Sequence, residues 1–225
     1  MRREVKLLSK YVLRGKDVIL DVGANKGLFT KYCMELIGND LTYILFEPSK
    51  INHYHLMKIY EGQNNILIKN YALSDVSEKA LLYSDLPGSG LGSLYDRDLN
   101  YLGINFESCE EVEKIRFDDF CKRYSIDVNR ICIVKIDVEG HEYGVLLGMA
   151  DHLKNIPVIQ FEFGGCNIAS KTYFSNFYNY FYNNDFVLYR VSPIGLIKID
   201  AYKECMEKFL TTNYIALNKR WFDNG

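Results

Sequence analysis

The sequence predicts an α/β protein with a doubly wound, mostly parallel β-sheet. Two observations carry this prediction. Short apolar runs alternate with segments of helical periodicity along the chain, which is typical of strands joined by crossover helices. The runs are also apolar throughout, as in strands that are covered on both faces. Because the chain has 225 residues, 48% of them hydrophobic, we expect a single domain, residues 1–225, with a sizeable core.

The expected elements follow one another from residue 17 onwards. The apolar run 17–22 ends in a glycine turn, and apolar residues then recur three and four positions apart, which predicts a strand followed by a helix. Pro48 ends the second apolar run, and Ser49 is placed to cap the next helix. The same alternation continues to the end of the chain. We expect strands at 17–22, 41–48, 64–73, 129–137, 156–163, 185–191, 195–200 and 213–219, and helices at 27–38, 50–60, 141–153 and 171–185.

Two segments leave their role open. The helix 171–185 is rich in Tyr and Phe, and these side chains could either pack a core or line a pocket for a sugar-like ligand. The stretch 84–113 fits no period and is rich in glycine. A long irregular segment in a compact domain is usually a lid or a binding loop. We interpret it as a lid, with a solvated insertion as the alternative.

The global properties exclude several classes of protein. The formal net charge is -2, which gives no indication of nucleic acid or an anionic membrane as a partner. No apolar run is long enough for a membrane span, and the basic N-terminus has no apolar stretch of the kind found in signal peptides. The six cysteines form no CxxC pair. They are best interpreted as reduced thiols in a cytoplasmic protein.

The turn after the first strand, DVGANKG at 21–27, indicates a ligand site. Gly23 and Gly27 permit a tight turn and a close approach of the ligand to the backbone. The spacing differs from the dinucleotide fingerprint, because position 25 is Asn, and there is no phosphate-binding Lys-Ser/Thr pair. Asp21 would repel a phosphate but suits a cationic ammonium group. A glycine turn without any ligand is the alternative.

Polar residues at the ends of the next two strands suit a nucleoside attached to such an ammonium group. Glu47 ends the second strand and is placed to accept hydrogen bonds from a ribose diol. Ser74 and Asp75 follow the third strand, where an adenine amino group could be held, although this pair is also typical of a turn. A nucleoside with an amino-acid tail facing Asp21 and Asn25 is S-adenosylmethionine.

The motifs VILDVGANKGLFT, FEPS, NYALSD, VKIDVEGHE and IQFEFG occur in this order between residues 17 and 165. In this they resemble the FkbM-type methyltransferases, a branch of the class I S-adenosylmethionine-dependent enzymes. The resemblance implies a Rossmann-like, seven-strand, mostly parallel sheet with a reversed last strand. It also implies O-methylation, often of sugar or polyketide hydroxyls, with S-adenosylhomocysteine as product.

The resemblance also assigns roles to residues. It implies that the turn with Asp21, Gly23, Asn25 and Gly27 holds the cofactor. Glu47 and the adjoining Ser49 would lie at the ribose, and Ser74 and Asp75 would flank the adenine. The segment GSGLGSL at 88–94 is similar to a Gly/Ser segment of the family, which places Ser93 beside the cofactor.

The segment KIDVEGHE at 135–142 is the best candidate for the chemistry. Asp137 ends the fourth strand and would lie beside the cofactor and the acceptor, with Glu139 and His141 next to it. Transfer to a hydroxyl needs a group that takes its proton. His141 titrates near neutral pH and is a natural base. Asp137 could be the base instead, or both could only orient the acceptor. Glu162, at the end of the fifth strand, is a further polar group on the same rim.

Other chemistries remain alternatives. Asp137, Glu139, His141 and Glu162 include enough ligand atoms for a divalent cation, but their spacing is no strong metal signature, so we expect none. Glu142 lies at the start of the expected helix 141–153, where a carboxylate suits the helix dipole. The expected partner is a small hydroxylated acceptor, best interpreted as a saccharide, with a polyketide or lipid as alternatives. A noncatalytic nucleoside-binding module and a nicotinamide dehydrogenase are the competing functions.

Overall fold

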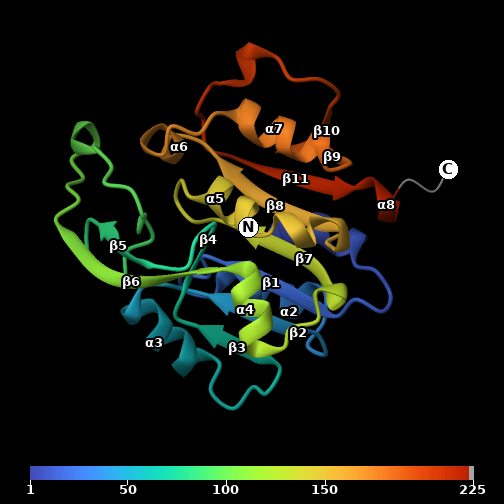
Figure 1. The fold of residues 1–225 in the computed structure, drawn as a ribbon, viewed down its shortest axis with the longest axis horizontal. Helices are drawn as coiled ribbons and strands as arrows, with labels where there is room; N and C mark the ends of the chain where they lie inside the picture. Colours follow the sequence, from blue (N-terminus) through green and yellow to red (C-terminus); the bar gives the residue numbers. More distant parts are fainter. Residues whose placement is uncertain (223–225) are drawn as a thin grey trace.

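An eight-stranded sheet lies between two layers of helices in the computed structural model, which describes residues 1–222 (Figure 1). The strand order is β3-β2-β1-β7-β8-β11-β9-β10. The strands of this sheet are β1 Val18–Val22, β2 Thr42–Phe46, β3 Ile66–Lys69, β7 Ile131–Ile136, β8 Val158–Phe163, β9 Phe186–Ser192, β10 Gly195–Ile199 and β11 Thr212–Asn218. The helices are α1 Arg2–Leu8, α2 Leu28–Leu36, α3 Lys50–Ile59, α4 Phe117–Tyr124, α5 Glu142–Gly148, α6 Cys166–Ala169, α7 Phe174–Asn183 and α8 Lys219–Phe222.

The topology confirms the predicted doubly wound class. The strands β3, β2, β1, β7 and β8 pair in parallel, and β11 runs antiparallel to both β8 and β9. This is the reversed last strand that the family resemblance implied. The sheet has one strand more than the seven expected, because β10 adds to its edge as an antiparallel hairpin with β9. The strand order reverses between β1 and β7, and ligands bind at such a reversal, beyond the carboxyl ends of the strands.

A second, three-stranded sheet corrects two sequence expectations. It has the order β4-β6-β5, with β4 Ala72–Ser74, β5 Lys79–Ser84 and β6 Ser108–Arg116. The run expected as one strand at 64–73 therefore divides, because β3 pairs with β2 and β4 pairs with β6. The stretch 84–113 is not irregular throughout either, since its two ends pair in the β5–β6 hairpin. The sequence of β6 shows no clear apolar period, because most of its residues are charged and only Val112 and Ile115 are buried in it.

The two faces of the large sheet carry separate hydrophobic cores. One core lies under α1, α2 and α3, and the other under α4, α5 and α7. The aromatic helix α7 buries Phe174, Phe177 and Phe181 at helical spacing. These rings pack against Phe161 and Phe163 of β8, with ring centroids 4.8 Å apart for Phe161 and Phe177. The Phe side of this helix therefore packs a core.

The helices and the cysteines bear on the expectations about membranes and disulfides. In the part of the chain described, residues 1–222, no helix combines the length and the apolar character that crossing a bilayer requires. All six cysteines are free thiols, and four of them are buried. Burial in apolar surroundings raises the pKa of Cys33, Cys121, Cys132 and Cys166, which keeps these thiols protonated and unreactive.

Candidate active site

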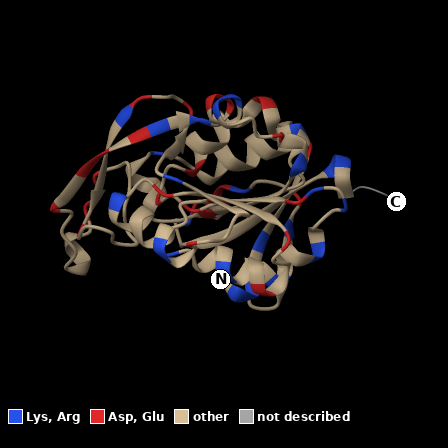
Figure 2. Cartoon of the chain, turned by 90° about the horizontal axis from the view of Figure 1, so that it is seen from below, with Lys and Arg blue, Asp and Glu red and all other residues tan. Residues whose placement is uncertain are grey.

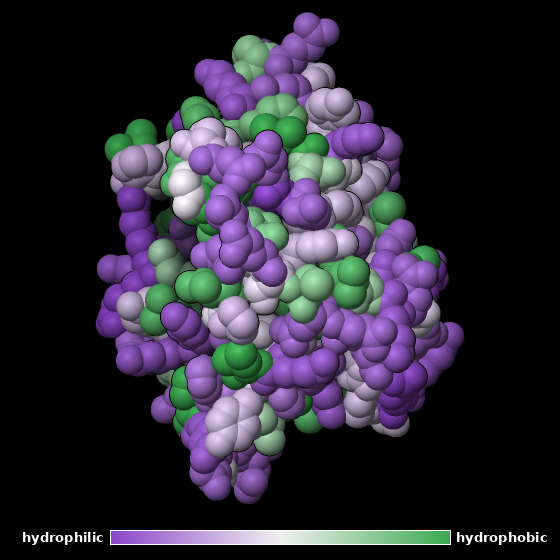
Figure 3. Space-filling model, turned by 90° about the vertical axis from the view of Figure 1, so that its left-hand side faces the viewer, coloured by the Kyte–Doolittle hydropathy of each residue, from purple (hydrophilic) through white to green (hydrophobic). Residues whose placement is uncertain are grey.

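A cavity of about 270 Å³ opens at the carboxyl ends of β1, β2 and β7, at the point where the strand order reverses. Figure 3 shows this side of the molecule, where polar and apolar side chains surround a hollow. The predicted site residues that line the cavity are Gly23, Asn25, Glu47, Ser49, Asp137, Glu139 and His141. The predicted residues Asp21, Gly27, Ser74, Asp75, Ser93 and Glu162 lie outside its lining. The structure thus brings seven of the thirteen predicted residues into the lining of a single cavity, and the other six lie outside that lining.

The glycine turn packs too closely for side chains. Gly23 has φ +78°, and a Cβ atom there would lie 1.9 Å from the backbone oxygen of Asp137. Gly27 has φ +74°, and a Cβ atom there would lie 2.9 Å from the Leu56 side chain. The backbone N–H of Gly23 donates to the Phe46 carbonyl at 3.0 Å. Gly23 therefore lets the turn lie against the ends of β2 and β7, and Gly27 lets it lie against α3.

Lys135 is a buried cation that sequence reasoning missed. It lies inside the apolar strand β7 and is 3% exposed. Its Nζ lies 3.3 Å from the Asp21 carboxylate and 3.4 Å from the Asp137 carboxylate. Burial alone would lower the pKa of Lys135, but Asp137 and Asp21 outweigh it and raise that pKa. A lysine within an apolar strand, two residues before a predicted site carboxylate, was the signal that could have found it.

Asp21 is held away from the cavity. Its second oxygen accepts a hydrogen bond from the Thr30 hydroxyl at 2.7 Å, and the side chain is fully buried. The contacts make Asp21 a counter-charge for Lys135. Asp137 shares the same lysine and lines the cavity, so it is the carboxylate placed nearer to a ligand. A direct contact of Asp21 with an ammonium group stays a prediction.

Glu47 anchors the cavity wall. One of its oxygens accepts from the Asn25 backbone N–H at 2.7 Å, and the other from the Ser49 N–H at 3.0 Å. Burial raises the pKa of Glu47 to about 7, although the two N–H donors oppose this. The Ser49 hydroxyl is buried and has no hydrogen-bond partner among residues 1–222. It makes no cap hydrogen bond to α3, so the expected capping by its side chain is wrong, and the hydroxyl is left available to a ligand.

We expect Glu47→Gln to weaken cofactor binding about 100-fold, because the amide cannot accept from both backbone N–H groups and one donor loses its charged partner. Isothermal titration calorimetry with S-adenosylmethionine measures the change. Glu61→Gln, a substitution at an exposed position beyond α3, is the matched control and should bind as the unmodified chain does. Equal affinity in the Glu47 variant would contradict the assignment of Glu47 to the cofactor.

Both ring nitrogens of His141 lie within hydrogen-bond distance of a hydroxyl group. Nε2 lies 2.9 Å from the Ser74 hydroxyl, which in turn donates to Asp75, and Nδ1 lies 3.0 Å from the Tyr95 hydroxyl. Burial, together with nearby Lys114, lowers the pKa of His141 to about 4. A neutral imidazole with both nitrogens engaged is a weak base. These contacts favour a positioning role for His141, and its role as the general base stays a prediction.

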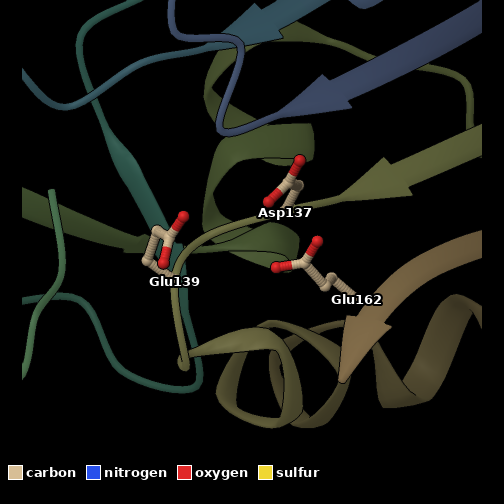
Figure 4. A group of neighbouring side chains, drawn as sticks. All are labelled: Asp137, Glu139 and Glu162. Atoms are coloured by element: carbon tan, nitrogen blue, oxygen red, sulfur yellow. The ribbon is translucent and has the colours of Figure 1, made fainter. Parts of the chain in front are cut away.

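Three carboxylates converge beside the cavity. Asp137 and Glu139 come from the turn after β7 and Glu162 from the end of β8, and Figure 4 shows their side chains pointing toward one another. One carboxylate oxygen from each of the three residues lies within 4.8 Å of the corresponding oxygens of the other two. Lys135 pairs with Asp137, and Arg97 pairs with Glu139 at 2.6 Å. Within residues 1–222, Glu162 has no such cation partner. Oxygen ligands in this number could also hold a divalent cation.

The electrostatics single out Glu162. Burial raises its pKa to about 8, and the neighbouring carboxylates of Asp137 and Glu139 add to this. Burial also raises the pKa of Glu139, but Arg97 opposes that shift. A carboxyl whose pKa is raised toward neutral pH, beside two further carboxylates that each have a cation partner, is a typical proton-transfer arrangement.

The irregular segment 85–107 is fastened to the turn at 137–141. The Ser93 hydroxyl donates to the Glu139 carbonyl at 2.7 Å, and Tyr95 and Arg97 contact His141 and Glu139 as described. Ser89, Gly90, Gly92 and Leu94 of the same segment line the cavity. Ser93 itself is not among the lining residues, and its hydroxyl holds the segment against Glu139. Its place beside the cofactor stays a prediction. Tyr95 and Arg97 carried no periodic signal and were missed by sequence reasoning.

Glu142 has a structural role at the start of α5. Its fully buried carboxylate accepts from the backbone N–H groups of Val138 and Gly140, at 3.0 and 3.1 Å, and from the Asn167 amide at 3.2 Å. Gly140 has φ +110°, and a Cβ atom there would lie 2.6 Å from the Cys166 carbonyl oxygen. Glu142 and Gly140 thus fix the sharp turn that presents Asp137 and Glu139.

Comparisons with known proteins identify the family and the fold of this chain. The sequence profile described as "Methyltransferase FkbM domain" matches residues 21–188. No curated protein matches the sequence of the chain. Among solved structures, methyltransferase FkbM from Methylobacillus flagellatus is similar, with 15% identity and a TM-score of 0.55 over 90% of this chain. This chain spans only 44% of that protein.

Two further structures share the fold. A putative rRNA methylase from Clostridium thermocellum has 10% identity and a TM-score of 0.52, covering 96% of this chain and 93% of its own. An rRNA methylase from Streptococcus thermophilus has 7% identity and a TM-score of 0.50, covering 96% and 94%. At these identities the likeness concerns the fold alone. The profile match covers residues 21–188, well over half of this chain. The chain therefore belongs to the FkbM family of S-adenosylmethionine-dependent methyltransferases.

Proposed function

We propose that this chain methylates a hydroxyl group of a small acceptor, a sugar or glycan, with S-adenosylmethionine as methyl donor. The observation that carries the proposal is the carboxylate cluster of Asp137, Glu139 and Glu162, which adjoins the cavity at the strand reversal. A module that only binds a nucleoside has no need of three converging acids, because their mutual repulsion costs stability.

The cavity fits the cofactor. Glu47 and the partnerless Ser49 hydroxyl offer an acceptor and a donor for ribose hydroxyls. The side chains of Tyr71, Ala72 and Leu73 line the cavity and present an apolar wall suited to adenine. Asp137 offers a carboxylate to an ammonium group. When bound, the cofactor supplies an electrophilic methyl group on a sulfonium, with S-adenosylhomocysteine as the product.

Glu162 is the residue we assign to proton transfer. An alcohol is a weak nucleophile at neutral pH, so its proton must leave as the new oxygen–carbon bond forms. Asp137 and Glu139 are paired with Lys135 and Arg97, and as carboxylates they can accept hydrogen bonds that orient the acceptor. Within residues 1–222 Glu162 has no ion-pair partner. A cationic sulfonium nearby favours its carboxylate form, and that carboxylate takes the hydroxyl proton. His141, with both nitrogens engaged, holds the turn.

The choice of a saccharide rests on the family resemblance and on the polar rim of the cavity. Figure 2 shows acidic and basic residues interspersed along the ribbon in that view, which does not favour a polyanion as acceptor. The free cysteines suit a reducing, cytoplasmic setting. Polyketide, lipid and nucleic-acid acceptors are outcomes that the test distinguishes.

The test has two parts. Calorimetry with S-adenosylmethionine, S-adenosylhomocysteine and NAD should show binding of the first two, and a preference for NAD would overturn the proposal. A screen for transfer of a radiolabelled methyl group to nucleotide sugars, oligosaccharides, hydroxylated lipids, polyketides and RNA then identifies the acceptor. Cofactor binding without transfer to any hydroxyl would favour the nucleoside-binding module.

We expect Arg97→Gln to lower turnover about tenfold with a smaller change in cofactor affinity, because the partly buried charge pair with Glu139 is lost. Without the guanidinium, the pKa of Glu139 rises further, so the carboxylate that orients the acceptor is neutralised. Steady-state kinetics measure the change in turnover, and calorimetry measures the change in cofactor affinity. Arg130→Gln removes a more exposed pair with Asp17, 2.8 Å long and at the amino ends of β1 and β7, and should leave turnover unchanged. Equal effects of both variants would contradict a role for Arg97 in the site.

A further inference from the structure

A second cavity, of about 260 Å³, lies at the outer end of the large sheet. It is bounded by α7, by the β9–β10 hairpin and by the segment 200–211 that leads into β11. Its floor is formed by aromatic and aliphatic side chains. These include Phe163, Phe174, Phe209, Tyr214, Met206 and Ile199. The cavity does not share a lining residue with the cofactor cavity.

The segment 200–211, which forms one wall of this cavity, is held by hydrogen bonds and close packing. The carboxylate of Glu207 accepts from the backbone N–H groups of Phe174 and Ser175, at 2.7 and 2.8 Å, and from the Tyr202 hydroxyl at 3.0 Å. It therefore caps α7 and fastens the segment 200–211 to that helix. At the other end of the segment, a Cβ atom on Gly164 would lie 2.6 Å from the Thr211 Cα. The segment is thus packed against the end of β8.

The mouth of the cavity is cationic. Arg190, Lys198 and Lys208 are exposed and line it. Lys198 pairs with Asp200 at 3.2 Å. Across residues 1–222, neither Arg190 nor Lys208 has a carboxylate within the 4.0 Å of an ion pair, and the nearby Glu207 is committed to capping α7. An apolar floor beneath positive charges that lack partners is complementary to a ligand with an apolar body and one acidic head.

We propose that this cavity is a binding site for an amphipathic anion, whose apolar chain lies on the aromatic floor and whose carboxylate or phosphate contacts Arg190 and Lys208. The site is independent of methyl transfer. It would therefore exist even if the proposed function were wrong, and cofactor binding is a separate readout that distinguishes the two failures.

The test is displacement of anilinonaphthalene sulfonate, a fluorescent aromatic anion, by dodecanoate, dodecyl phosphate and dodecanol. We expect one probe molecule per chain, displaced by both anions, with dodecanol about tenfold weaker because it has no charge for Arg190. The relative strength of the two anions tells a carboxylate ligand from a phosphate ligand. Arg190→Leu should weaken dodecanoate about tenfold and leave dodecanol unchanged.

Two further variants make the result decisive. Ile197→Trp fills the cavity from a side chain that is 40% exposed, so the chain should still fold while probe binding is lost. Arg14→Leu removes an exposed charge elsewhere on the chain and should change nothing. All variants should retain the affinity for S-adenosylmethionine, which shows that they are folded. No displacement by either anion at about 1 mM, or displacement unchanged in Arg190→Leu and Ile197→Trp, would overturn the proposal.

Discussion

Glu162→Gln is expected to lower turnover about 100-fold or more, the contribution of a positioned general base, with little change in cofactor affinity. The amide keeps the shape of the side chain but cannot take a proton. Stability should stay the same or rise, because the substitution removes a buried acid that Asp137 and Glu139 repel. Single-turnover kinetics, calorimetry with the cofactor and thermal melting measure the three quantities separately.

The pH dependence provides a second measure of the same residue. Burial raises the pKa of Glu162 to about 8 in the chain without cofactor, and a base must be deprotonated to act. Activity should therefore fall as the pH is lowered through a midpoint at or below 8, since a cationic sulfonium nearby stabilises the carboxylate. The Gln variant should lose this limb of the profile.

Two results would contradict the assignment. Full turnover in Glu162→Gln would remove Glu162 from proton transfer and return the role to His141 or Asp137. Activity that is lost on chelation and restored by a divalent cation would show instead that the three carboxylates hold a metal. Glu113→Gln, at an exposed position on β6, controls for a simple change of charge.

Gly23→Ala is expected to abolish measurable cofactor binding and to lower the free energy of unfolding by about 3 kcal/mol or more. The new Cβ atom would lie 1.9 Å from the Asp137 carbonyl oxygen, in a backbone conformation with φ +78°. Both the glycine turn and the turn that presents Asp137 must then move. Denaturant unfolding and calorimetry measure the two effects.

Gly15→Ala is the matched control. Gly15 has nearly the same φ, +80°, but nothing lies within 4 Å of the position of its Cβ atom. The cost there is the backbone strain alone, about 1 kcal/mol, and cofactor binding should be intact. If the two variants lose similar stability, the close approach of Gly23 to Asp137 does not hold the site together.

The parts of the fold that local chemistry controls were predictable from the sequence. Apolar runs bounded by glycine turns indicated β1, β2, β7 and β8, and the periodicity of 27–38 indicated α2. The carboxyl ends of parallel strands meet at one edge, so Glu47 and Asp137 could be placed at the same cavity before any coordinates. The FkbM family followed from the same motifs, and the family match confirms it.

Contacts between segments far apart in the sequence were not predictable. Lys135 lies in an apolar strand, and only the approach of β1 makes it the counter-charge of Asp21 and Asp137. Ser74 and His141 are separated by 67 positions, and their hydrogen bond forms because α5 packs against β4. The ionisation of these groups then depends on burial.

The sequence by itself determined the family, the alternation of strands and helices, and the set of acids at the strand ends, because side-chain periodicity and turn chemistry are local. Only the tertiary structure decided which acid lacks a cation, since Arg97 reaches Glu139 from a segment with no regular period. The same holds for the second cavity, whose lining gathers residues from β8, α7, β9, β10 and β11. Burial and pairing are properties of the assembled chain, and they set the proton affinity of each group.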